Sequence, residues 1–334
     1  MDKMITLAHG GGGRKTSELI NNIFRKHLGN EEFTSDDAAV LEPAAKKIAF
    51  TTDGFIVTPW RFPGGNIGKL SICGTVNDLT CMGAHPKWLS CACVIEEGTP
   101  VDDVEEIVRA MAETAIEAGV HIVCGDTKVA GRGQVDHMFI TTTGIGELQD
   151  GICPKGSNAT RGDAVIVTND IGRHGCTILL SRDQYGIDAD IKSDCAPLWG
   201  TVSSLFTITK NLHTIRDATR GGVGTVLYEL ARESNKGIRI DRSKIPVDPA
   251  VAGVCGMLGL DPLYLACEGT MVILAPMDDA GKIVEKLHSG KYSRNAAVIG
   301  TVTDDEPGKV FVKTDVGTEM ILPEPGGELL PRIC

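Results

Sequence analysis

The chain contains 334 residues, 42% of them hydrophobic, and its 33 basic and 44 acidic residues give a net charge of −11. This length predicts a substantial core in two domains or one large one. The acidic balance argues against nucleic acid or an anionic membrane as a partner. We expect no membrane span and no signal peptide, because apolar runs are short and the start is glycine-rich. The odd number of cysteines, 11, indicates a reducing cytoplasm rather than a disulfide framework.

The first half of the chain predicts alternating strands and helices. Strands are expected at residues 47–52, 89–95, 121–124 and 139–144, where apolar and β-branched residues lie between turn residues. One helix is expected after Gly64-Gly65-Asn66, because apolar residues then recur at three- and four-residue steps. A second, strongly amphipathic helix is expected from Val101.

The second half repeats this alternation, so the predicted fold class is mixed α/β (α+β). Residues 147–163 are rich in Gly, Pro, Asn and Asp and mark the boundary between the two expected domains. We predict domains at 1–150 and 151–322 and a tail at 323–334. Strands are predicted at 164–168, 271–275, 296–302, 309–313 and 319–322, and helices near 194–212, 222–233 and 279–288.

Five cysteines gather in the first half, and none of their pairs has the two-residue gap that zinc and cluster sites favour. Buried free cysteine packs as a small hydrophobic residue, so core packing is the favoured interpretation. A soft-metal site is the alternative. The five are Cys73, Cys81, Cys91, Cys93 and Cys124.

Aspartates recur in the first half where strands are predicted to end or helices to present a polar face. Carboxylates at strand ends point into the crevice where α/β proteins bind ligands, and Mg²⁺ would neutralise several of them while bridging phosphate oxygens. Each aspartate taken singly is equally a helix cap or a turn residue. The candidates are Asp36, Asp37, Asp53, Asp78 and Asp126.

Glycine-rich loops offer backbone N–H groups to an anion, although no standard nucleotide motif is present. The segment from His9 to Thr16 and the segment from Gly64 to Leu70 both depart from the Walker pattern, and no Rossmann fingerprint follows a strand. In the second half, the turn from Arg216 to Gly222 and Glu268 are weaker candidates.

The chain ends Pro331-Arg332-Ile333-Cys334, after a segment of prolines and glycines that is typical of a tether. From Pro323 this segment reaches on the order of 40 Å when extended. A thiol on a tether can carry a covalent group between two sites. The alternative is an inert terminus.

Four motifs resemble the ATP–Mg²⁺ signature of the aminoimidazole-ribonucleotide-synthetase (PurM-like) superfamily: Ser35–Val40, Thr51-Thr52-Asp53, Asn77-Asp78-Leu79 and Gly125-Asp126-Thr127. Within it, the chain resembles the carbamoyl dehydratase family of hydrogenase maturation proteins over almost its whole length. Phe62–Leu70, Gly125–Val129, Arg216–Val223 and the closing tetrapeptide carry that resemblance.

The resemblance implies a two-domain PurM-like fold, bound ATP and Mg²⁺, and a homodimer in which the first domains pair. It implies that a carbamoyltransferase loads a carbamoyl group onto the terminal cysteine. ATP then drives dehydration of the thiocarbamate to a thiocyanate, and the cyano group passes to iron on a hydrogenase scaffold complex. We hypothesise that the thiocarbamate oxygen attacks the γ-phosphate of ATP, so that it leaves as phosphate while a base takes the N–H protons.

The resemblance also assigns roles to residues. Cys334, Lys128 and Glu268 are expected to be catalytic, and Lys128 acts either as a base or as a phosphate-binding cation. The family typically reads Asn-Glu-Gly-Lys where this chain has Cys267-Glu268-Gly269-Thr270. Nucleotide binding is assigned to Asp37, Asp53, Gly64, Gly65, Asn66, Lys69, Asp78, Asp126 and Thr127, and metal binding to Asp37, Asp53, Asp78 and Asp126.

Two other functions stay open at this point. A small-molecule kinase of the same superfamily would need no terminal cysteine. A cysteine-based iron chaperone would not need Asp53 or Asp126.

Overall fold

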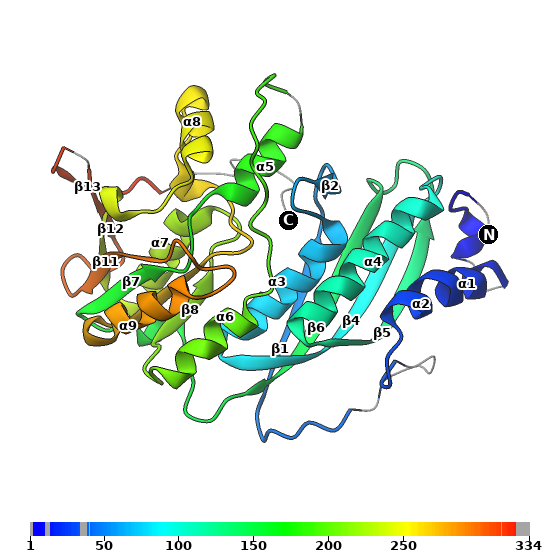
Figure 1. Ribbon diagram of the computed structural model, residues 1–334, viewed down its shortest axis with the longest axis horizontal. Helices are drawn as coiled ribbons and strands as arrows, with labels where there is room; N and C mark the ends of the chain where they lie inside the picture. Colours follow the sequence, from blue (N-terminus) through cyan, green and yellow to red (C-terminus); the bar gives the residue numbers. More distant parts are fainter. Residues whose placement is uncertain are drawn as a thin grey trace.

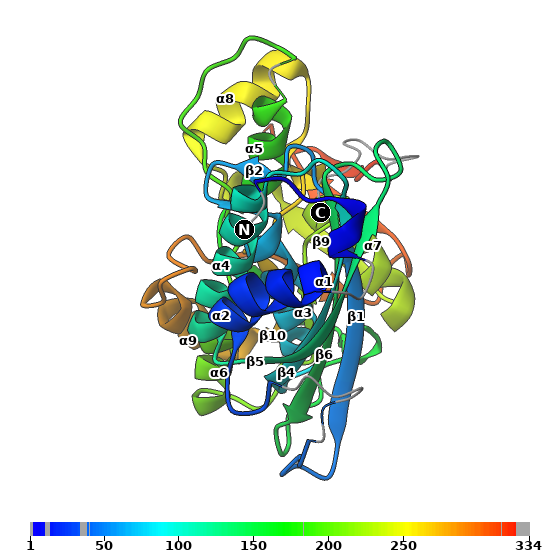
Figure 2. The ribbon, with the colours of Figure 1, turned by 90° about the vertical axis from the view of Figure 1, so that its right-hand side faces the viewer.

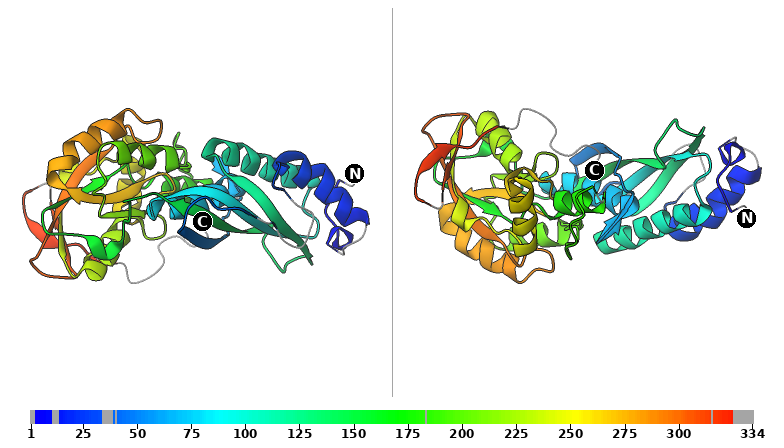
Figure 3. Two further views of the ribbon diagram at one scale, coloured as in Figure 1. Left: turned by 90° about the horizontal axis from the view of Figure 1, so that it is seen from below. Right: turned by 90° about the horizontal axis from the view of Figure 1, so that it is seen from above.

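The computed structural model describes residues 3–10, 14–33, 39, 41–182, 184–314 and 316–324. Two β-sheets organise the molecule, one with four strands and one with seven, and the helix α3 (Ile67–Cys81) lies between them (Figure 1). The molecule is elongated, with the N-terminal helices at one end and the larger sheet at the other (Figure 3). The predicted mixed α/β class is confirmed. The domain bounds 1–150 and 151–322 and the tail at 323–334 stay a prediction.

The four-stranded sheet has the order β1 (Ile48–Phe55), β6 (Met138–Leu148), β4 (Ala84–Glu96), β5 (His121–Ala130). Only β4 and β5 run parallel; the other pairs are antiparallel. Helices α3 and α4 (Val101–Ala118) cover one face, since alternate strand residues such as Leu89, Cys91 and Ile95 are buried against them. The four strands and two helices predicted in this half are present.

Short elements complete the first half. The helices η1 (Leu7–His9), α1 (Arg14–Leu19), η2 (Ile20–Phe24) and α2 (Arg25–Leu28) lie beside α4 and the β5 edge (Figure 2). A small hairpin of β2 (Arg61–Phe62) and β3 (Gly65–Asn66) leads into α3.

The seven-stranded sheet has the order β13 (Glu319–Ile321), β12 (Val310–Lys313), β9 (Gly237–Asp241), β11 (Ala297–Thr303), β7 (Asp163–Val167), β10 (Met271–Pro276), β8 (Thr214–Asp217). Its central strands are buried on both faces: Val165 and Val167 face one core cluster, and Ala164 and Ile166 face another. Helix α7 (Gly222–Ser234) packs in the first cluster and α9 (Met277–His288) in the second. The sheet is therefore the middle layer of an α/β/α sandwich.

The remaining helices connect these layers. They are η3 (Gly156–Asn158), α5 (Arg173–Ser181), α6 (Trp199–Ser203), η4 (Ser204–Thr207), η5 (Arg242–Lys244), α8 (Pro249–Leu258) and η6 (Pro262–Tyr264). Helices α5 and α8 pack on each other and project from the body of the molecule (Figure 2). No helix in the part of the chain that the structure describes is long and apolar enough to cross a membrane.

Two sequence predictions about local structure are wrong. Residues 194–198 are not helical, because their backbone bonds to Asn77 of α3 instead of continuing into α6. The strand predicted to end at Gly125-Asp126 continues to Ala130, since it pairs with the parallel strand β4 along its whole length. Asp126 therefore lies inside a strand, as Asp53 does in β1.

Candidate functional site

Asp53 and Asp78 come together on the face of the four-stranded sheet that α3 covers. Strand alternation places Thr51 and Asp53 on the same face of β1, and Thr51 Oγ1 donates a hydrogen bond of 2.8 Å to Asp78 Oδ2. Burial, together with the negative charges of Asp217 and Asp53, raises the pKa of Asp78 to about 7. The two carboxyls thus form a partly desolvated acidic pair.

Asp217, the last residue of β8, brings a third carboxyl from the second half of the chain. Burial and the charge of Asp53 raise its pKa, while Arg216 opposes the rise. Sequence analysis did not select Asp217 individually, although it belongs to the strand-to-helix turn that was noted. Its position shows that the acidic site lies where the two sheets meet.

The acidic pair has the chemistry of a magnesium site. No three His, Cys, Asp or Glu side chains within the described ranges are arranged to hold a metal ion by themselves. Mg²⁺ commonly takes only one or two protein carboxylates and completes its shell with phosphate oxygens and water. Asp53 and Asp78 match that donor set. Asp37, another of the four predicted metal ligands, lies outside the described residues.

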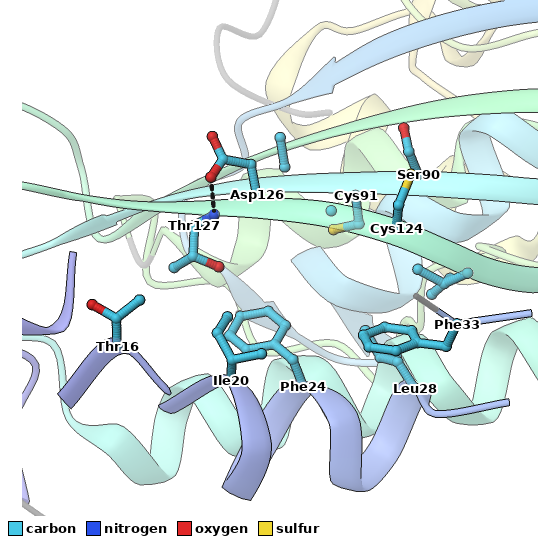
Figure 4. A pocket seen from close by; sticks show the side chains of 13 residues that line it. Thr16, Ile20, Phe24, Leu28, Phe33, Ser90, Cys91, Cys124, Asp126 and Thr127 are labelled. Carbon is cyan, nitrogen blue, oxygen red and sulfur yellow. Dashed lines mark hydrogen bonds between the residues drawn. The ribbon is translucent and has the colours of Figure 1, made fainter. Parts of the chain in front are cut away.

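Asp126 does not join Asp53 and Asp78 within one chain. Across the sheet, Asp53 of β1 lies opposite Thr142 of β6, Thr142 lies opposite Cys91 of β4, and Cys91 lies opposite Gly125 of β5. Asp126 follows Gly125, so it is three strands away from Asp53 and one residue out of register. Three strand spacings amount to roughly 14 Å. Because side chains alternate along a strand, this shift of one residue turns the Asp126 side chain to the open face of the sheet, the face that α3 and α4 do not cover. Figure 4 shows Asp126 and Thr127 pointing to opposite sides of their strand.

Lys128 pairs with Asp126 on this open face. Its Nζ lies 2.9 Å from Asp126 Oδ2, and the two side chains are 65% and 60% exposed. The hydrogen bond from Lys128 is the main cause that lowers the pKa of Asp126. Lys128 is therefore an exposed cation on the open face of the sheet, and its two expected roles stay predictions.

A cavity of about 470 Å³ lies between the N-terminal helices and strands β4 and β5. Ile20, Phe24 and Leu28 form its apolar helical wall, and Thr127 points toward them from β5 (Figure 4). An apolar slot with a few polar groups at one side is typical of a small-molecule pocket. Sequence analysis missed this cavity, because the short helices that wall it have no strong periodic signal.

Glu268 is the buried carboxyl of the site. It lies in the turn before β10, is 2% exposed, and its Oε1 has no hydrogen-bond partner among the described residues. Burial, then the nearby Cys195 and the charges of Asp194, Asp217 and Asp53, raise its pKa well above the ordinary range. Glu268 therefore adjoins the same acidic junction as the metal candidates.

The two residues that depart from the family pattern around Glu268 are built into the core. Cys267 Sγ accepts a hydrogen bond from the Gly172 N–H at 3.1 Å, and Thr270 Oγ1 donates to the Asp170 carbonyl at 2.9 Å. These contacts support the turn without occupying the Glu268 carboxyl.

The predicted glycine loop lies at the start of α3. The Asn66 side chain accepts hydrogen bonds from the N–H groups of Gly68 and Lys69 at 2.9 and 3.1 Å, so it caps the helix. Lys69 Nζ donates to the Gly64 carbonyl at 2.9 Å, and the Ser193 N–H donates to the Pro63 carbonyl at 2.9 Å. Gly64 adopts a left-handed φ of 95°. Gly65 directly precedes the cap residue. The bond from Ser193 holds the loop against the segment whose next residue, Asp194, accepts the Glu268 N–H.

The described cysteines are all free. Cys73, Cys81, Cys91 and Cys93 are buried, and the sulfurs of Cys91 and Cys93 lie 3.6 Å apart on one strand face. Core packing is confirmed for these four residues. Cys124 is partly exposed and lines the cavity.

Cys334 lies outside the described residues, but the root of its segment is visible. Leu322 is fully buried, and its carbonyl accepts a hydrogen bond from the Tyr228 hydroxyl. The Tyr264 hydroxyl bonds the Pro323 carbonyl, and Arg232 forms two hydrogen bonds of 2.8 and 2.6 Å to Glu324. Tyr264 precedes Glu268 by four residues. Ten residues follow Glu324 in the sequence, and a chain of that length spans roughly 33–36 Å when extended.

Comparison with known proteins agrees with this architecture. Residues 35–148 match the AIR synthase related protein, N-terminal domain, and residues 160–313 match the corresponding C-terminal domain. The chain is 41% identical to carbamoyl dehydratase HypE of Rhodobacter capsulatus, over 100% of this chain and 99% of that protein.

Two solved structures are also similar. A crystal structure of hydrogenase maturation protein HypE in complex with ATP superposes with a TM-score of 0.95 at 41% identity, covering 98% of this chain and 99% of that chain. In a HypE–HypF complex, one chain gives a TM-score of 0.81 at 44% identity, covering 92% of this chain and 99% of that one.

Proposed function

Because the chain belongs to the carbamoyl dehydratase HypE family of AIR synthase related proteins, we propose that it uses ATP to dehydrate a carbamoyl group carried on its own Cys334. The product is a thiocyanate that supplies cyanide for the iron of [NiFe]-hydrogenase. The observation that carries the proposal is the junction of the two sheets, where the acidic pair Asp53–Asp78 adjoins the buried Glu268. This junction thus combines carboxylates that suit a metal–phosphate site with a buried carboxyl that suits proton transfer.

The reaction needs both properties because an amide oxygen is a poor leaving group. The thiocarbamate oxygen forms a bond to the γ-phosphorus of ATP while the bond from that phosphorus to ADP breaks. The C–O bond then breaks with loss of phosphate, and both N–H protons leave to form the C≡N bond. Glu268 is our candidate proton acceptor, since a desolvated carboxylate with a raised pKa is a stronger base than an exposed one. Mg²⁺ held by Asp53 and Asp78 would supply charge neutralisation for the phosphate oxygens.

We also infer a homodimer, because the site residues are divided between two faces and two edges of one sheet. The open face carries Asp126 and Lys128 together with Ile48 and Phe50, which are 49% and 68% exposed. A second copy that covers this face with its β5 edge toward β1 would bring Asp126 and Lys128 to the edge that holds Asp53. The cavity beside Thr127 would then be available for the planar adenine base of the nucleotide.

The proposal assigns the partners by chemistry. A carbamoyltransferase must load the thiol, and the complex of the related HypE with HypF supports such a partner. An iron-carrying scaffold must accept the cyano group. The free cysteines of the described chain are consistent with a reducing cytoplasm. The two alternatives have less support: the described cysteines form no metal-holding group, and the full-length relative at 41% sequence identity is a carbamoyl dehydratase.

Intact mass spectrometry tests the proposal. The purified chain is incubated with carbamoyl phosphate, ATP, Mg²⁺ and the carbamoyltransferase. We expect carbamoylation followed by loss of one water, both mapped to Cys334. Cys334→Ala should show neither change, whereas Cys153→Ala, which removes an exposed cysteine elsewhere, should show both. Loss of water in the Cys334→Ala protein would overturn the proposal.

A further inference from the structure

The backbone of Glu268 is held from both sides by side chains that come from distant parts of the chain. Asp194 Oδ1 accepts the Glu268 N–H at 3.1 Å, and Asp194 Oδ2 accepts the Gly269 N–H at 3.0 Å. Asn77 Nδ2 donates to the Glu268 carbonyl at 3.4 Å. The backbone N–H and the backbone carbonyl of Glu268 are therefore both hydrogen-bonded.

Asn77 also fixes the segment that carries Asp194. Its Nδ2 donates to the Ala196 carbonyl at 3.0 Å, and its Oδ1 accepts the Leu198 N–H at 2.9 Å. Asn77 is 3% exposed and precedes Asp78 on α3. Among neutral side chains, only an amide donates two hydrogen bonds from one atom while a neighbouring atom accepts another. One buried amide thus connects the helix of the acidic pair to the turn of Glu268.

Close packing keeps the turn in one position. A Cβ added to Gly269 would lie 1.9 Å from the Asp194 carbonyl oxygen, so the two segments are in direct backbone contact. Thr270 Oγ1, whose proton goes to the Asp170 carbonyl, lies 3.4 Å from Asp194 Oδ2 and packs against that carboxylate. The Ala196 N–H donates to the Glu268 carbonyl at 3.4 Å.

This bracing matters because the Glu268 carboxyl gains little from its own surroundings. A buried carboxyl oxygen without a partner costs free energy and would turn toward water if its backbone could move. We propose that Asp194 and Asn77 are positioning residues that hold Glu268 for the dehydration step. The inference rests on the proposed function of Glu268 and assigns neither residue a contact with the substrate.

A double-mutant cycle tests the inference on the full-length chain with the carbamoyltransferase, carbamoyl phosphate, ATP and Mg²⁺. We expect Asp194→Asn to slow the maximal single-turnover dehydration by about 10- to 100-fold, since small misplacements of a reacting group have effects of this size. The ATP concentration that gives half the maximal rate should stay within about twofold, because the ATP site is untouched. Asp194→Ala should be slower than Asp194→Asn, which keeps one acceptor oxygen.

The decisive comparison uses Glu268→Gln. If Asp194 acts through Glu268, the double variant Asp194→Asn/Glu268→Gln should be no slower than Glu268→Gln alone. Multiplicative losses would overturn the inference. Asn77→Ala supplies the same test from the first half of the chain if Asp194→Asn does not fold.

Asp163→Asn is the matched control. Asp163 is a buried aspartate that accepts hydrogen bonds from the Thr160 N–H and His213 Nδ1, both at 2.8 Å, away from the site. The Asp163→Asn substitution should lower the stability of the protein and leave the dehydration rate per folded molecule unchanged. If the wild type does not dehydrate, the proposed function fails. If the wild type dehydrates and Glu268→Gln is silent, only the role of Glu268 and this inference fall.

Discussion

The carboxyl of Asp78 is balanced between two protonation states. The hydrogen bond from Thr51 favours the charged form, but burial and the charges of Asp217 and Asp53 outweigh it and raise the pKa to about 7. Only the deprotonated carboxylate binds a hard cation. Cation binding at this site is therefore coupled to loss of a proton near neutral pH.

We expect the affinity for a non-hydrolysable ATP analogue at saturating Mg²⁺ to be about tenfold lower at pH 6 than at pH 8, because Asp78 is protonated below its raised pKa. Isothermal titration calorimetry at the two pH values measures the change. Asp78→Asn should bind the analogue weakly at both pH values, and Asp163→Asn should show the same change of affinity between pH 6 and pH 8 as the wild type. An affinity that is equal at the two pH values would contradict a role for Asp78 as a ligand.

At the scale of elements, the contact between α3 and α4 allows no added side chain. A Cβ on Gly68 would lie 2.2 Å from the Ile107 carbonyl oxygen of α4. Gly68 is in the first turn of α3, two residues after the Asn66 cap. The glycine therefore sets how closely the two helices approach, and with it the position of Asp78, nearly three turns later in α3.

Gly68→Ala should destabilise the protein by about 1–3 kcal/mol, because the added methyl group forces the two helices apart. Gly253→Ala is the control: this glycine lies on the exposed side of α8 with no heavy atom within 4 Å of the added Cβ. It should stabilise the protein by about 0.5–1 kcal/mol. Urea unfolding measures both. Equal effects of the two substitutions would contradict the close-contact explanation.

Local patterns predicted the elements whose signals are local. Asn66 before an apolar repeat predicted the start of α3, and the amphipathic run from Val101 predicted α4. Helix α8 was missed because its residues are small or apolar on all sides, so no periodicity stands out. Residues 194–198 were misassigned because their backbone bonds go to Asn77, more than a hundred residues earlier.

The same distinction applies to the candidate site. The motifs identified Asp53, Asp78 and Glu268, and the structure brings them to one junction. The motifs could not show that Asp126 turns to the opposite face, since that depends on the strand register. Nor could they show that Asp194 braces Glu268, which follows only from the packing of the turn.

At the scale of the whole molecule, the proposed phosphate-binding residues that the structure describes are divided between the two faces of one sheet. Asp53 of β1 and Asp78 of α3 meet on the helix-covered face, and Asp126 and Lys128 lie on the open face of β5, the strand at the opposite edge. In the proposed homodimer, a symmetric pair of chains would supply each edge with the groups that the other lacks. This arrangement makes a specific prediction about mixed dimers.

Asp78→Asn and Asp126→Asn should each abolish dehydration as separate homodimers. After the two are mixed and allowed to exchange subunits, about a quarter of the wild-type activity should return, because roughly half the dimers are mixed and each then contains one intact site of two. Light scattering confirms the dimer, and the mass assay measures activity. Mixtures that stay inactive after verified exchange would show that each site lies within one chain.

The burial of the cysteines has a consequence for chemical selectivity. Burial raises the pKa of Cys176 to about 12 and that of Cys255 to about 11, and it raises the pKa of Cys81 and Cys267 well above the ordinary range. Such thiols stay protonated and shielded, so they react poorly with electrophiles. Of the cysteines in the described ranges, Cys153 is exposed and Cys124 partly so. A fold that needs one sulfur to be acylated has thereby removed most of its competing nucleophiles, and an alkylating reagent should show the same preference.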